Sequence, residues 1–178
     1  GGGAKQYVNN LTNTINCNDV DVSRILTNAT DILNRDEGKN PYLVHEELQD
    51  IMQNNVGIVR TAEELQIGLG KLDSLKADIE NVYAHASPQY NPGWNEALDL
   101  KNLIITAEAV TRAAILREES RGAHTRIDFE GEREEGLSYN IIIKKTDSSM
   151  TAEKISREDP PQELVDIAHA SLKELEGE

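Results

Sequence analysis

The stretch that decides the fold is Leu100-Lys-Asn-Leu-Ile-Ile-Thr-Ala-Glu-Ala-Val-Thr-Arg-Ala-Ala-Ile-Leu-Arg-Glu-Glu-Ser-Arg-Gly-Ala-His-Thr-Arg126. Apolar residues recur in it at steps of three and four, which predicts a helix with one buried stripe made of Leu100, Leu103, Ala107, Val110 and Ala114. The two alanines would let a partner helix approach closely. Gly122 is expected to end this helix, because glycine readily adopts the left-handed conformation found at helix ends.

A compact polar cluster follows the stripe and contains Arg121, His124, Arg126 and Asp128. One interpretation is a helix end at which basic side chains compensate the helix dipole and glycine provides the cap. The other is an exposed basic tip that docks on an acidic partner surface. Composition alone favours the first interpretation.

The chain has 178 residues, a formal net charge of −14 and a pI near 4.7. This length suffices for one domain with a real core and a smaller appendage. So acidic a chain repels phosphate backbones, and nucleic-acid binding is therefore not expected. Aromatic residues make up only 4% of the sequence, which suits a helical bundle packed with Leu, Ile and Ala.

The single cysteine, Cys17, excludes an internal disulfide and favours a reducing compartment. No apolar run reaches the roughly 18 residues needed to cross a bilayer, and no signal peptide is visible. These observations predict a cytoplasmic protein. The opening Gly1-Gly2-Gly3 is interpreted either as a cloning remnant or as the cut edge of a longer polypeptide.

Two helices are expected before residue 40. A weak apolar pattern over residues 7–15 allows a short helix. Asp21 is a plausible N-cap for a second helix, whose apolar face consists of Val22, Ile25, Leu26, Ala29, Ile32 and Leu33.

Two capping signals start the next helices. Asn40-Pro41 supplies a cap and a first helical residue, and Thr61 with Glu64 makes a capping box. The helix from Thr61 carries a heptad-like repeat that is expected to be buried: Leu65, Gly68, Leu72, Leu75, Ile79 and Val82. Gly68 and Gly70 each cost about 1 kcal/mol of helix stability against alanine. Close packing of a neighbouring element is the expected benefit.

The long helix is expected to run from about Asn95, after a proline-containing loop, to Arg121. At about 1.5 Å per residue it would be roughly 40 Å long. The helix from Thr61 is of similar length, so the two should lie antiparallel. With one or more earlier helices they would form an up-and-down bundle.

The composition changes after Asp128-Phe129. A two-residue alternation over residues 139–144, a turn at residues 146–149 and a return over residues 150–156 predict a β-hairpin. Two strands alone are marginal in water, so this hairpin needs a surface to pack on. Pro160-Pro161 then introduces a short amphipathic helix.

The sequence contains no recognised catalytic or metal-binding pattern. Di-metal bundles use Glu-x-x-His pairs and zinc hydrolases use His-Glu-x-x-His, and neither occurs. A Gly-x-Ser-x-Gly nucleophile elbow is also missing. The four histidines are scattered along the chain: His45, His85, His124 and His169. No residue is therefore expected to be catalytic or to bind a metal.

Three segments resemble one known family. The segment Glu119-Ser-Arg-Gly-Ala-His-Thr-Arg-Ile-Asp128 resembles the Glu-Ser-Arg-Gly-Ala-His-x-Arg-x-Asp signature of the succinate dehydrogenase/fumarate reductase flavoprotein family. Residues 48–60 are similar to its Met-x-x-x-x-Gly-Ile-x-Arg segment, and residues 96–103 resemble the Leu-x-Asn segment that opens its last long helix. The matches cover roughly residues 20–130 in order. One departure is the absence, from residues 137–139, of a tryptophan usual at the start of the hairpin.

The resemblance implies the C-terminal domain of a larger flavoprotein subunit. Its fold would be mainly α, a spectrin-repeat-like three-helix bundle over residues 1–130 with a β-hairpin and short helix over residues 131–178. The parent would bind FAD, interconvert succinate and fumarate, and pass electrons to an iron–sulfur subunit on the inner face of the cell membrane. This chain alone lacks the family's dinucleotide-binding motifs and is expected to bind no cofactor and to be inactive.

The resemblance also implies a role for the signature, which would dock the bundle on the FAD-binding domain of the same polypeptide. The expected docking residues are Glu119, Ser120, Arg121, Gly122, His124, Arg126 and Asp128. Two alternatives remain: the C-terminal domain of L-aspartate oxidase, which shares the motif but generally lacks a long hairpin tail, and a stand-alone helical interaction module. The extended tail after Asp128 favours the succinate dehydrogenase/fumarate reductase interpretation over L-aspartate oxidase.

Overall fold

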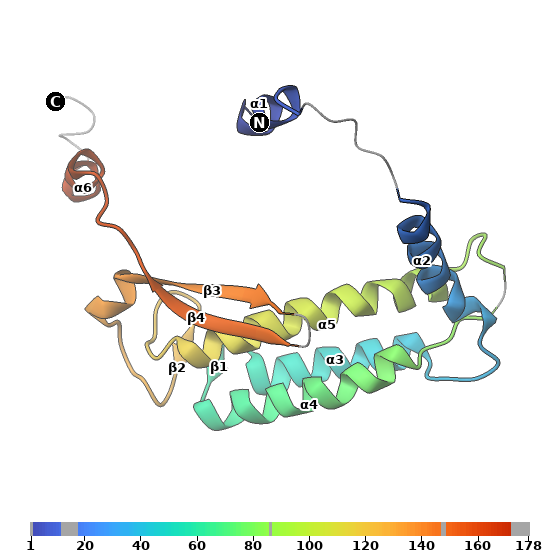
Figure 1. Ribbon diagram of the computed structural model, residues 1–178. Helices are drawn as coiled ribbons and strands as arrows, with labels where there is room; N and C mark the ends of the chain where they lie inside the picture. Colours follow the sequence, from blue (N-terminus) through green and yellow to red (C-terminus); the bar gives the residue numbers. More distant parts are fainter. Residues whose placement is uncertain (1, 12–17, 86, 147–148, 172–178) are drawn as a thin grey trace.

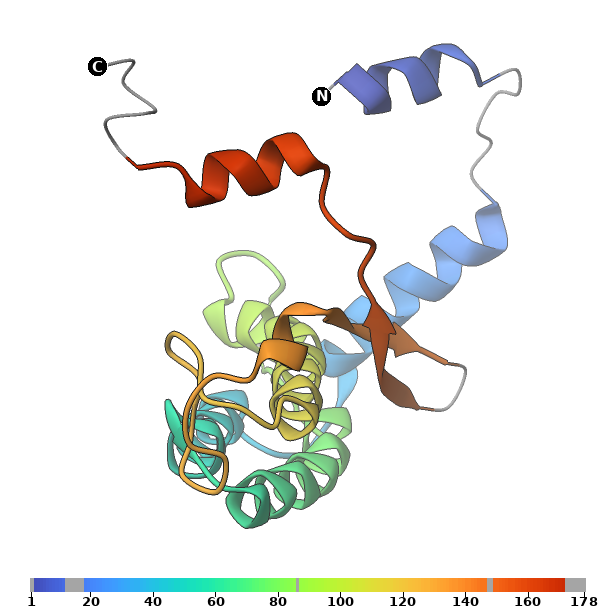
Figure 2. The same ribbon diagram turned by 90° about the vertical axis from the view of Figure 1, so that its left-hand side faces the viewer.

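The computed structural model describes residues 2–11, 18–85, 87–146 and 149–171. Its centre is an up-and-down bundle of three long helices: α3 (Pro41–Val56), α4 (Ala62–Glu80) and α5 (Pro92–Leu116) (Figure 1). Figure 2, which looks along the bundle, shows the three helices packed side by side. The expectation of a mainly helical protein built on a three-helix bundle is confirmed.

Each bundle helix begins at the capping signal in its sequence. Asn40 Oδ1 accepts a hydrogen bond from the N–H of Tyr42 (3.0 Å) at the start of α3, and Thr61 Oγ1 accepts one from Glu64 (3.2 Å) at the start of α4. Asn91 caps α5 in the same way, so α5 begins at Pro92, three residues before the expected start. These side-chain oxygens satisfy N–H groups that have no partner inside the helix.

The core forms where the apolar stripes of the three helices meet. The heptad-like repeat of α4 is buried as expected from Leu65 to Val82. Gly68 permits a close approach, because a Cβ there would lie 2.9 Å from Asn55 Cβ on α3. The same expectation is wrong for Gly70, whose missing Cβ would point into open space.

The buried stripe of α5 is shifted from the expected one. Leu100, Ala107 and Ala114 are buried, but Leu103 and Val110 remain 37% and 42% exposed. The true stripe keeps strict steps of three and four and consists of Ala97, Leu100, Ile104, Ala107, Thr111 and Ala114. Both patterns share every seventh residue, so periodicity alone does not distinguish them.

The N-terminal helices lie outside the bundle. Helix α2 (Asp19–Thr30) is capped by Asn18 rather than Asp21, and its apolar face at Ile25 and Leu26 is more than 60% exposed. The short 3-10 helix η1 (Asp31–Asn34) inserts Ile32 into the core at 0% exposure. Helix α1 (Gly2–Asn9) stands away from the bundle in both views.

The hairpin has the expected strands and packs on the bundle. Strand β3 (Tyr139–Lys145) follows the 3-10 helix η2 (Glu134–Leu137) and pairs antiparallel with β4 (Met150–Ser156). The hairpin lies along α5, and Met150 is 9% exposed (Figure 1). Helix α6 (Gln162–His169) follows after Pro161 and stands apart. Within the described residues, no helix is long and apolar enough to span a membrane.

Candidate functional site

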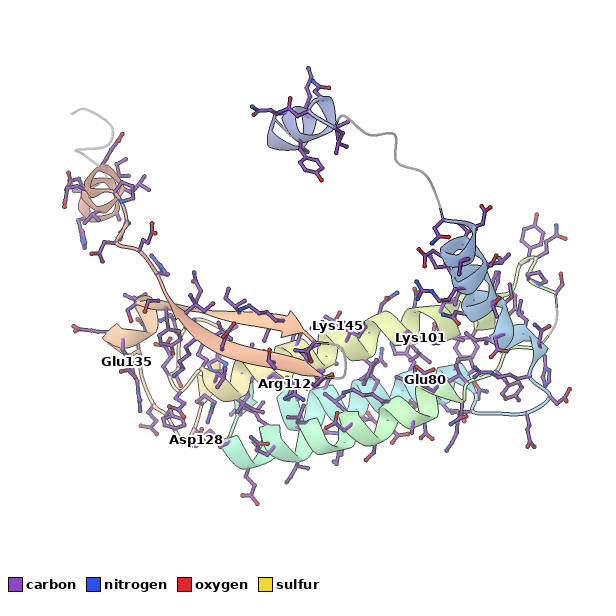
Figure 3. The ribbon with its side chains drawn as sticks, in the orientation of Figure 1. Glu80, Lys101, Arg112, Asp128, Glu135 and Lys145 are labelled. Carbon is purple, nitrogen blue, oxygen red and sulfur yellow. The ribbon has the colours of Figure 1, made fainter. Side chains whose placement is uncertain are left out.

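The signature segment folds over the end of the bundle where α5 stops. Helix α5 ends at Leu116 instead of Arg121, and the chain then turns back through Gly122. Strand β2 (Thr125–Arg126) pairs in parallel with β1 (Val59–Arg60), the link between α3 and α4. Figure 3 labels Asp128 at this end of the bundle. The segment therefore joins the last turn of α5 to the connection between the other two helices.

Arg126 is the buried centre of the segment, with only 1% exposure. Its Nη1 donates to the carbonyls of Ala114 (3.0 Å), Ile115 (3.3 Å) and Arg117 (3.3 Å), groups at the end of α5 that lack an intrahelical partner. Its Nε and Nη2 donate to the two carboxylate oxygens of Asp128, each at 2.8 Å. This is the planar, two-bond geometry for which a guanidinium is suited.

Asp128 connects the end of one helix to the start of another. Besides its two bonds from Arg126, its Oδ2 accepts from the N–H of Ala62 (2.8 Å), the first residue of α4. A carboxylate at a helix N-terminus also interacts favourably with the helix dipole. Hydrogen bonds from Arg126 and Ala62 outweigh the effect of burial and hold the pKa of Asp128 well below its usual range.

Arg60 closes the C-terminal end of α3 in a similar way. Its Nε donates to the carbonyls of Val56 (3.1 Å) and Gly57, and its Nη1 donates to His124 Nδ1 (2.6 Å). Because Nδ1 accepts, the proton of the neutral imidazole lies on Nε2, which donates to the carbonyl of Arg117 (2.9 Å). Burial, together with the neighbouring guanidiniums, lowers the pKa of His124, so the ring is neutral at pH 7.

Glu119 is a buried carboxylate with 1% exposure. It accepts from Arg121 Nε (3.2 Å) and Nη2 (3.1 Å), from the N–H of Arg133 (3.0 Å) and from Arg117. Burial alone would raise the pKa of Glu119, but these donors outweigh it and the pKa is lowered. Gly136 of η2 covers the carboxylate so closely that a Cβ there would collide with it.

Ser120 and Gly122 shape the backbone of the segment. Ser120 Oγ accepts from the N–H of Arg126 (2.8 Å) and lies within donating distance of the carbonyls of Arg126 and Phe129. Gly122 has φ +59° in the tight turn in which Arg121 and His124 exchange backbone hydrogen bonds. The left-handed conformation expected of Gly122 is therefore present, but it serves this turn and not the end of α5.

The structure gathers all the signature residues in one region, but their donors are largely used inside the chain. The picture of an exposed basic tip is wrong for Arg126, which is buried. Arg121 directs its guanidinium to Glu119, to Glu132 Oε2 (2.8 Å) and to the carbonyl of Arg133 (3.0 Å). The compensation of a helix end by a basic side chain holds for Arg126, whose guanidinium reaches carbonyls at the end of α5. The neutral ring of His124 donates to the carbonyl of Arg117 but adds no charge there.

Sequence reasoning did not identify three residues that complete the region: Arg60, Arg117 and Gly136. Arg60 and His124 are 64 positions apart, so no local pattern connects them. The only available signal was that Arg60 ends the Gly-Ile-x-Arg segment already matched to the family. Gly136 lies in a charged, glycine-containing stretch with no recognisable periodicity.

The chemistry of the region suits a rigid surface better than a reaction centre. Its carboxylates are held by guanidiniums, which leaves neither Glu119 nor Asp128 as an available general base. Sheets within the described residues are two-stranded, and neither is followed by a glycine-rich turn into a helix, so these residues do not fit an FAD site. No group of His, Cys, Asp or Glu among the described residues has the arrangement of a metal site.

Comparisons with known proteins give a consistent result. Residues 45–171 match the family described as the C-terminal part of the fumarate reductase flavoprotein. A fumarate reductase (CoM/CoB) subunit of Methanothermobacter marburgensis is 37% identical over 111 residues, which are 62% of this chain and 20% of that protein. L-aspartate oxidase of Acinetobacter baylyi is 35% identical over 97 residues, 54% of this chain and 17% of that protein.

A solved structure extends the similarity to nearly the whole chain. The apo Sdh1 complex of Mycobacterium smegmatis contains a chain that is 30% identical and superposes with a TM-score of 0.81. The match covers 98% of the present chain and 30% of that chain. The present chain thus spans less than a third of the relatives compared with it. With residues 45–171 matched and the fold shared, the chain belongs to the fumarate reductase flavoprotein C-terminal family.

Proposed function

We propose that this chain is the C-terminal domain of an FAD-dependent flavoprotein subunit that interconverts succinate and fumarate. The observation that carries the proposal is the family match over residues 45–171, supported by the similarity of nearly the whole chain to the Sdh1 structure. FAD, when bound, would supply hydride transfer and would be held by domains outside this chain. The present residues contribute packing and orientation, and no reaction step passes through them.

The signature segment, in this proposal, is the docking surface for the FAD-binding domain. Its residues are Glu119, Ser120, Arg121, Gly122, His124, Arg126 and Asp128. The internal bonds of Arg126, Asp128 and Glu119 support a surface that is rigid before docking, which lowers the entropy lost on association. The exposed positions of the segment lie in the turn at Gly122 and at residues 127 and 128, and these positions would make the direct contact.

The proposed surroundings of the parent subunit follow from the same family. Its partner would be an iron–sulfur subunit, and the parent would be a peripheral protein on the cytoplasmic face of the cell membrane. Residues 131–178 would form an extension of the bundle in residues 1–130. The net charge of −14 supports a partner other than a nucleic acid.

The proposal is tested by expressing the complete polypeptide encoded by the gene. We expect a bound flavin after dialysis, and succinate oxidation with an artificial electron acceptor or fumarate reduction with a reduced dye. A complete polypeptide without flavin absorbance, or one that holds flavin but is inactive with both dicarboxylates, would contradict it. Disrupting the region by Gly136→Ala should lower flavin content, whereas Gly70→Ala, on an open helix surface, should not.

A second candidate is supported by the similarity to L-aspartate oxidase. In the sequence comparisons that match covers 54% of the chain, against 62% for the fumarate reductase subunit of Methanothermobacter marburgensis. Superposition on the Sdh1 chain covers 98% of the present chain, including the hairpin. The substrate that the complete polypeptide oxidises distinguishes the two functions. Oxidation of L-aspartate by the complete polypeptide, without oxidation of succinate, would establish the second candidate and exclude the first.

A further inference from the structure

A groove beside the signature segment differs in charge from the rest of the molecule. It has a volume of about 610 Å³ and lies between the last turns of α5 and strand β3. Arg60, Arg117 and His124 line it, and Val110, Ile141 and Ile142 are among its apolar lining residues. No carboxylate is among the described residues that line it, although the chain carries a net charge of −14.

Arg60 gives this groove a positive charge that the described part of the chain does not neutralise. Its hydrogen bonds go to the carbonyls of Val56 and Gly57 and to the neutral ring of His124, and it forms no ion pair with a described carboxylate. Arg117, in contrast, shares its charge with buried Glu119. An approaching carboxylate would therefore meet Arg60 as a partly buried cation, where an ion pair is screened less than at an open surface.

Strand β3 borders the groove with its backbone edge. Three consecutive β3 residues, Asn140, Ile141 and Ile142, line it, so both faces of the strand meet there. Within the described chain, β3 pairs only with β4. The other edge of such a strand presents a row of N–H and C=O groups to any extended segment that approaches.

The hydrogen-bonding register identifies which β3 groups point outward. The N–H of Arg157 donates to Ser138 (2.8 Å), and the N–H of Thr146 donates to Ser149 (2.8 Å), at opposite ends of the hairpin. Both pairs continue the register in which Ile142 faces Glu153. Bonded pairs alternate along an antiparallel ladder, so the even-numbered β3 residues bond to β4. The odd-numbered residues, including Ile141, direct their N–H and C=O away from it.

We propose that this groove binds an extended acidic segment of the FAD-binding part of the same polypeptide, which adds a third strand to the hairpin at β3. The backbone of the segment pairs with Ile141, an apolar side chain packs on Val110, and a carboxylate pairs with Arg60. Charge complementarity and the open edge carry the inference, because together they select an extended, acidic occupant. Only the source of the segment rests on the proposed function. Most of the length of the relatives lies outside the part that matches this chain, and a segment tethered in the same polypeptide has a raised local concentration at the groove.

The experiment is hydrogen exchange resolved to single amides in the complete polypeptide. With the third strand in place, the Ile141 amide should exchange within about tenfold of the neighbouring Asn140 and Ile142 amides, which bond to β4. An Ile141 amide that exchanges as fast as an unstructured one, beside slow Asn140 and Ile142 amides, would show an open edge and overturn the proposal. The Leu72 amide in the core of α4 reports whether the bundle itself remains folded.

Charge substitutions in the groove test the acidic character of the segment. Val110→Glu should speed exchange of the Ile141 amide at least tenfold, because the new carboxylate repels the bound one. Val110→Lys should preserve slow exchange. Leu103→Glu is the matched control, since Leu103 is 37% exposed on the same helix and Val110 is 42% exposed. Equal effects of Val110→Glu and Val110→Lys, or of Val110→Glu and Leu103→Glu, would overturn an acidic occupant.

Two further measurements test whether the tail of this chain occupies the groove and whether the proposed function holds. A complete polypeptide shortened after Arg157 should keep the Ile141 amide slow, and loss of protection would identify the acidic tail of this chain as the occupant and overturn the proposal. Flavin content measured on the same preparations tests the proposed function separately. Absence of flavin would contradict that function while the Ile141 amide still reports whether the groove is occupied.

Discussion

Arg60 and Arg126 are register partners in the parallel pairing of β1 and β2, yet their guanidiniums close the ends of two different helices. Arg60 reaches carbonyls at the end of α3, and Arg126 reaches those at the end of α5. The short pairing of β1 with β2 thus brings the ends of α3 and α5 close together. The neutral ring of His124 accepts from Arg60 and donates to the carbonyl of Arg117, which also accepts from Arg126. An imidazolium there would add a third positive charge beside two guanidiniums.

Replacing Arg126 by alanine should strongly destabilise the chain. The change leaves the Asp128 carboxylate without its main partner and removes the donor to three carbonyls. The pair is buried on the Arg126 side and 30% exposed on the Asp128 side, and its loss together with the donor to the carbonyls should cost on the order of 3 kcal/mol. Urea unfolding followed by circular dichroism measures the loss. Arg24→Ala is the control, because the Arg24–Asp21 pair is exposed and should contribute less than about 1 kcal/mol. Similar losses for the two variants would contradict a central role of Arg126.

Two glycines on α4 should respond oppositely to alanine. Gly70→Ala should raise stability by about 0.5–1 kcal/mol, because the Cβ points into open space and alanine is the better helix former. In Gly68→Ala the same gain in helix stability is opposed by a steric clash, because the new Cβ would lie 2.9 Å from Asn55 Cβ and would push α3 and α4 apart. Thermal unfolding of both variants gives the comparison. If Gly68→Ala stabilised the protein as much as Gly70→Ala, the close approach of α3 and α4 at this point would be refuted.

Gly136→Ala should cost about 1–3 kcal/mol, the usual range for overpacking a filled site. The added methyl collides with the carboxylate of Glu119, which cannot move without losing bonds from Arg121 and Arg133. A double-mutant cycle with Glu119→Ala measures the collision itself. The cost of Gly136→Ala should shrink once the carboxylate is gone, and purely additive losses would place the strain elsewhere.

The pKa of His124 predicts a pH dependence of stability. The folded protein lowers this pKa below its ordinary value of 6.5, so the unfolded chain binds the proton more readily. The contribution of His124 to the free energy of unfolding should therefore be fully present above pH 6.5. It should decrease as the pH falls from 6.5 toward the lower pKa of the folded state. His124→Gln offers an acceptor and a donor in similar positions without titrating. Unfolding at pH 8 and pH 5.5 should show a smaller loss in this variant, and an unchanged loss would assign it to other groups.

The sequence predicted the bundle because local periodicity carries that information. The repeat from Leu65 to Val82 and the caps at Asn40 and Thr61 all lie where they were expected. The stripe of α5 was misplaced because two seven-residue patterns share Leu100 and Ala107. The end of α5 was also predicted too late, at Arg121 instead of Leu116. The carbonyls at the true end bond to Arg126, and no local sequence pattern indicates this contact.

The signature segment was found from the sequence, but its internal bonding was not. Free basic groups were expected to contact a neighbouring domain, and on that basis Arg121→Ala would leave the melting of the bundle almost unchanged. The structure changes this expectation, because Arg121 supplies two of the bonds to buried Glu119. Loss of those bonds should lower the melting temperature. Contacts that join residues 64 and 66 positions apart have no signature in composition or periodicity.

The bond from Ala62 to Asp128 also fixes an order of events during synthesis. Arg60 can close the end of α3 as soon as it leaves the ribosome, because its carbonyl partners precede it by three and four residues. Thr61 can cap the start of α4 at once, but the N–H of Ala62 must wait for a carboxylate made 66 residues later. A growing chain therefore passes through a stage with α3 closed and the N–H of Ala62 still without this partner. Only when Asp128 has been made can the bond to Ala62 form, so α5 and the signature segment after it determine when this end of the bundle is complete.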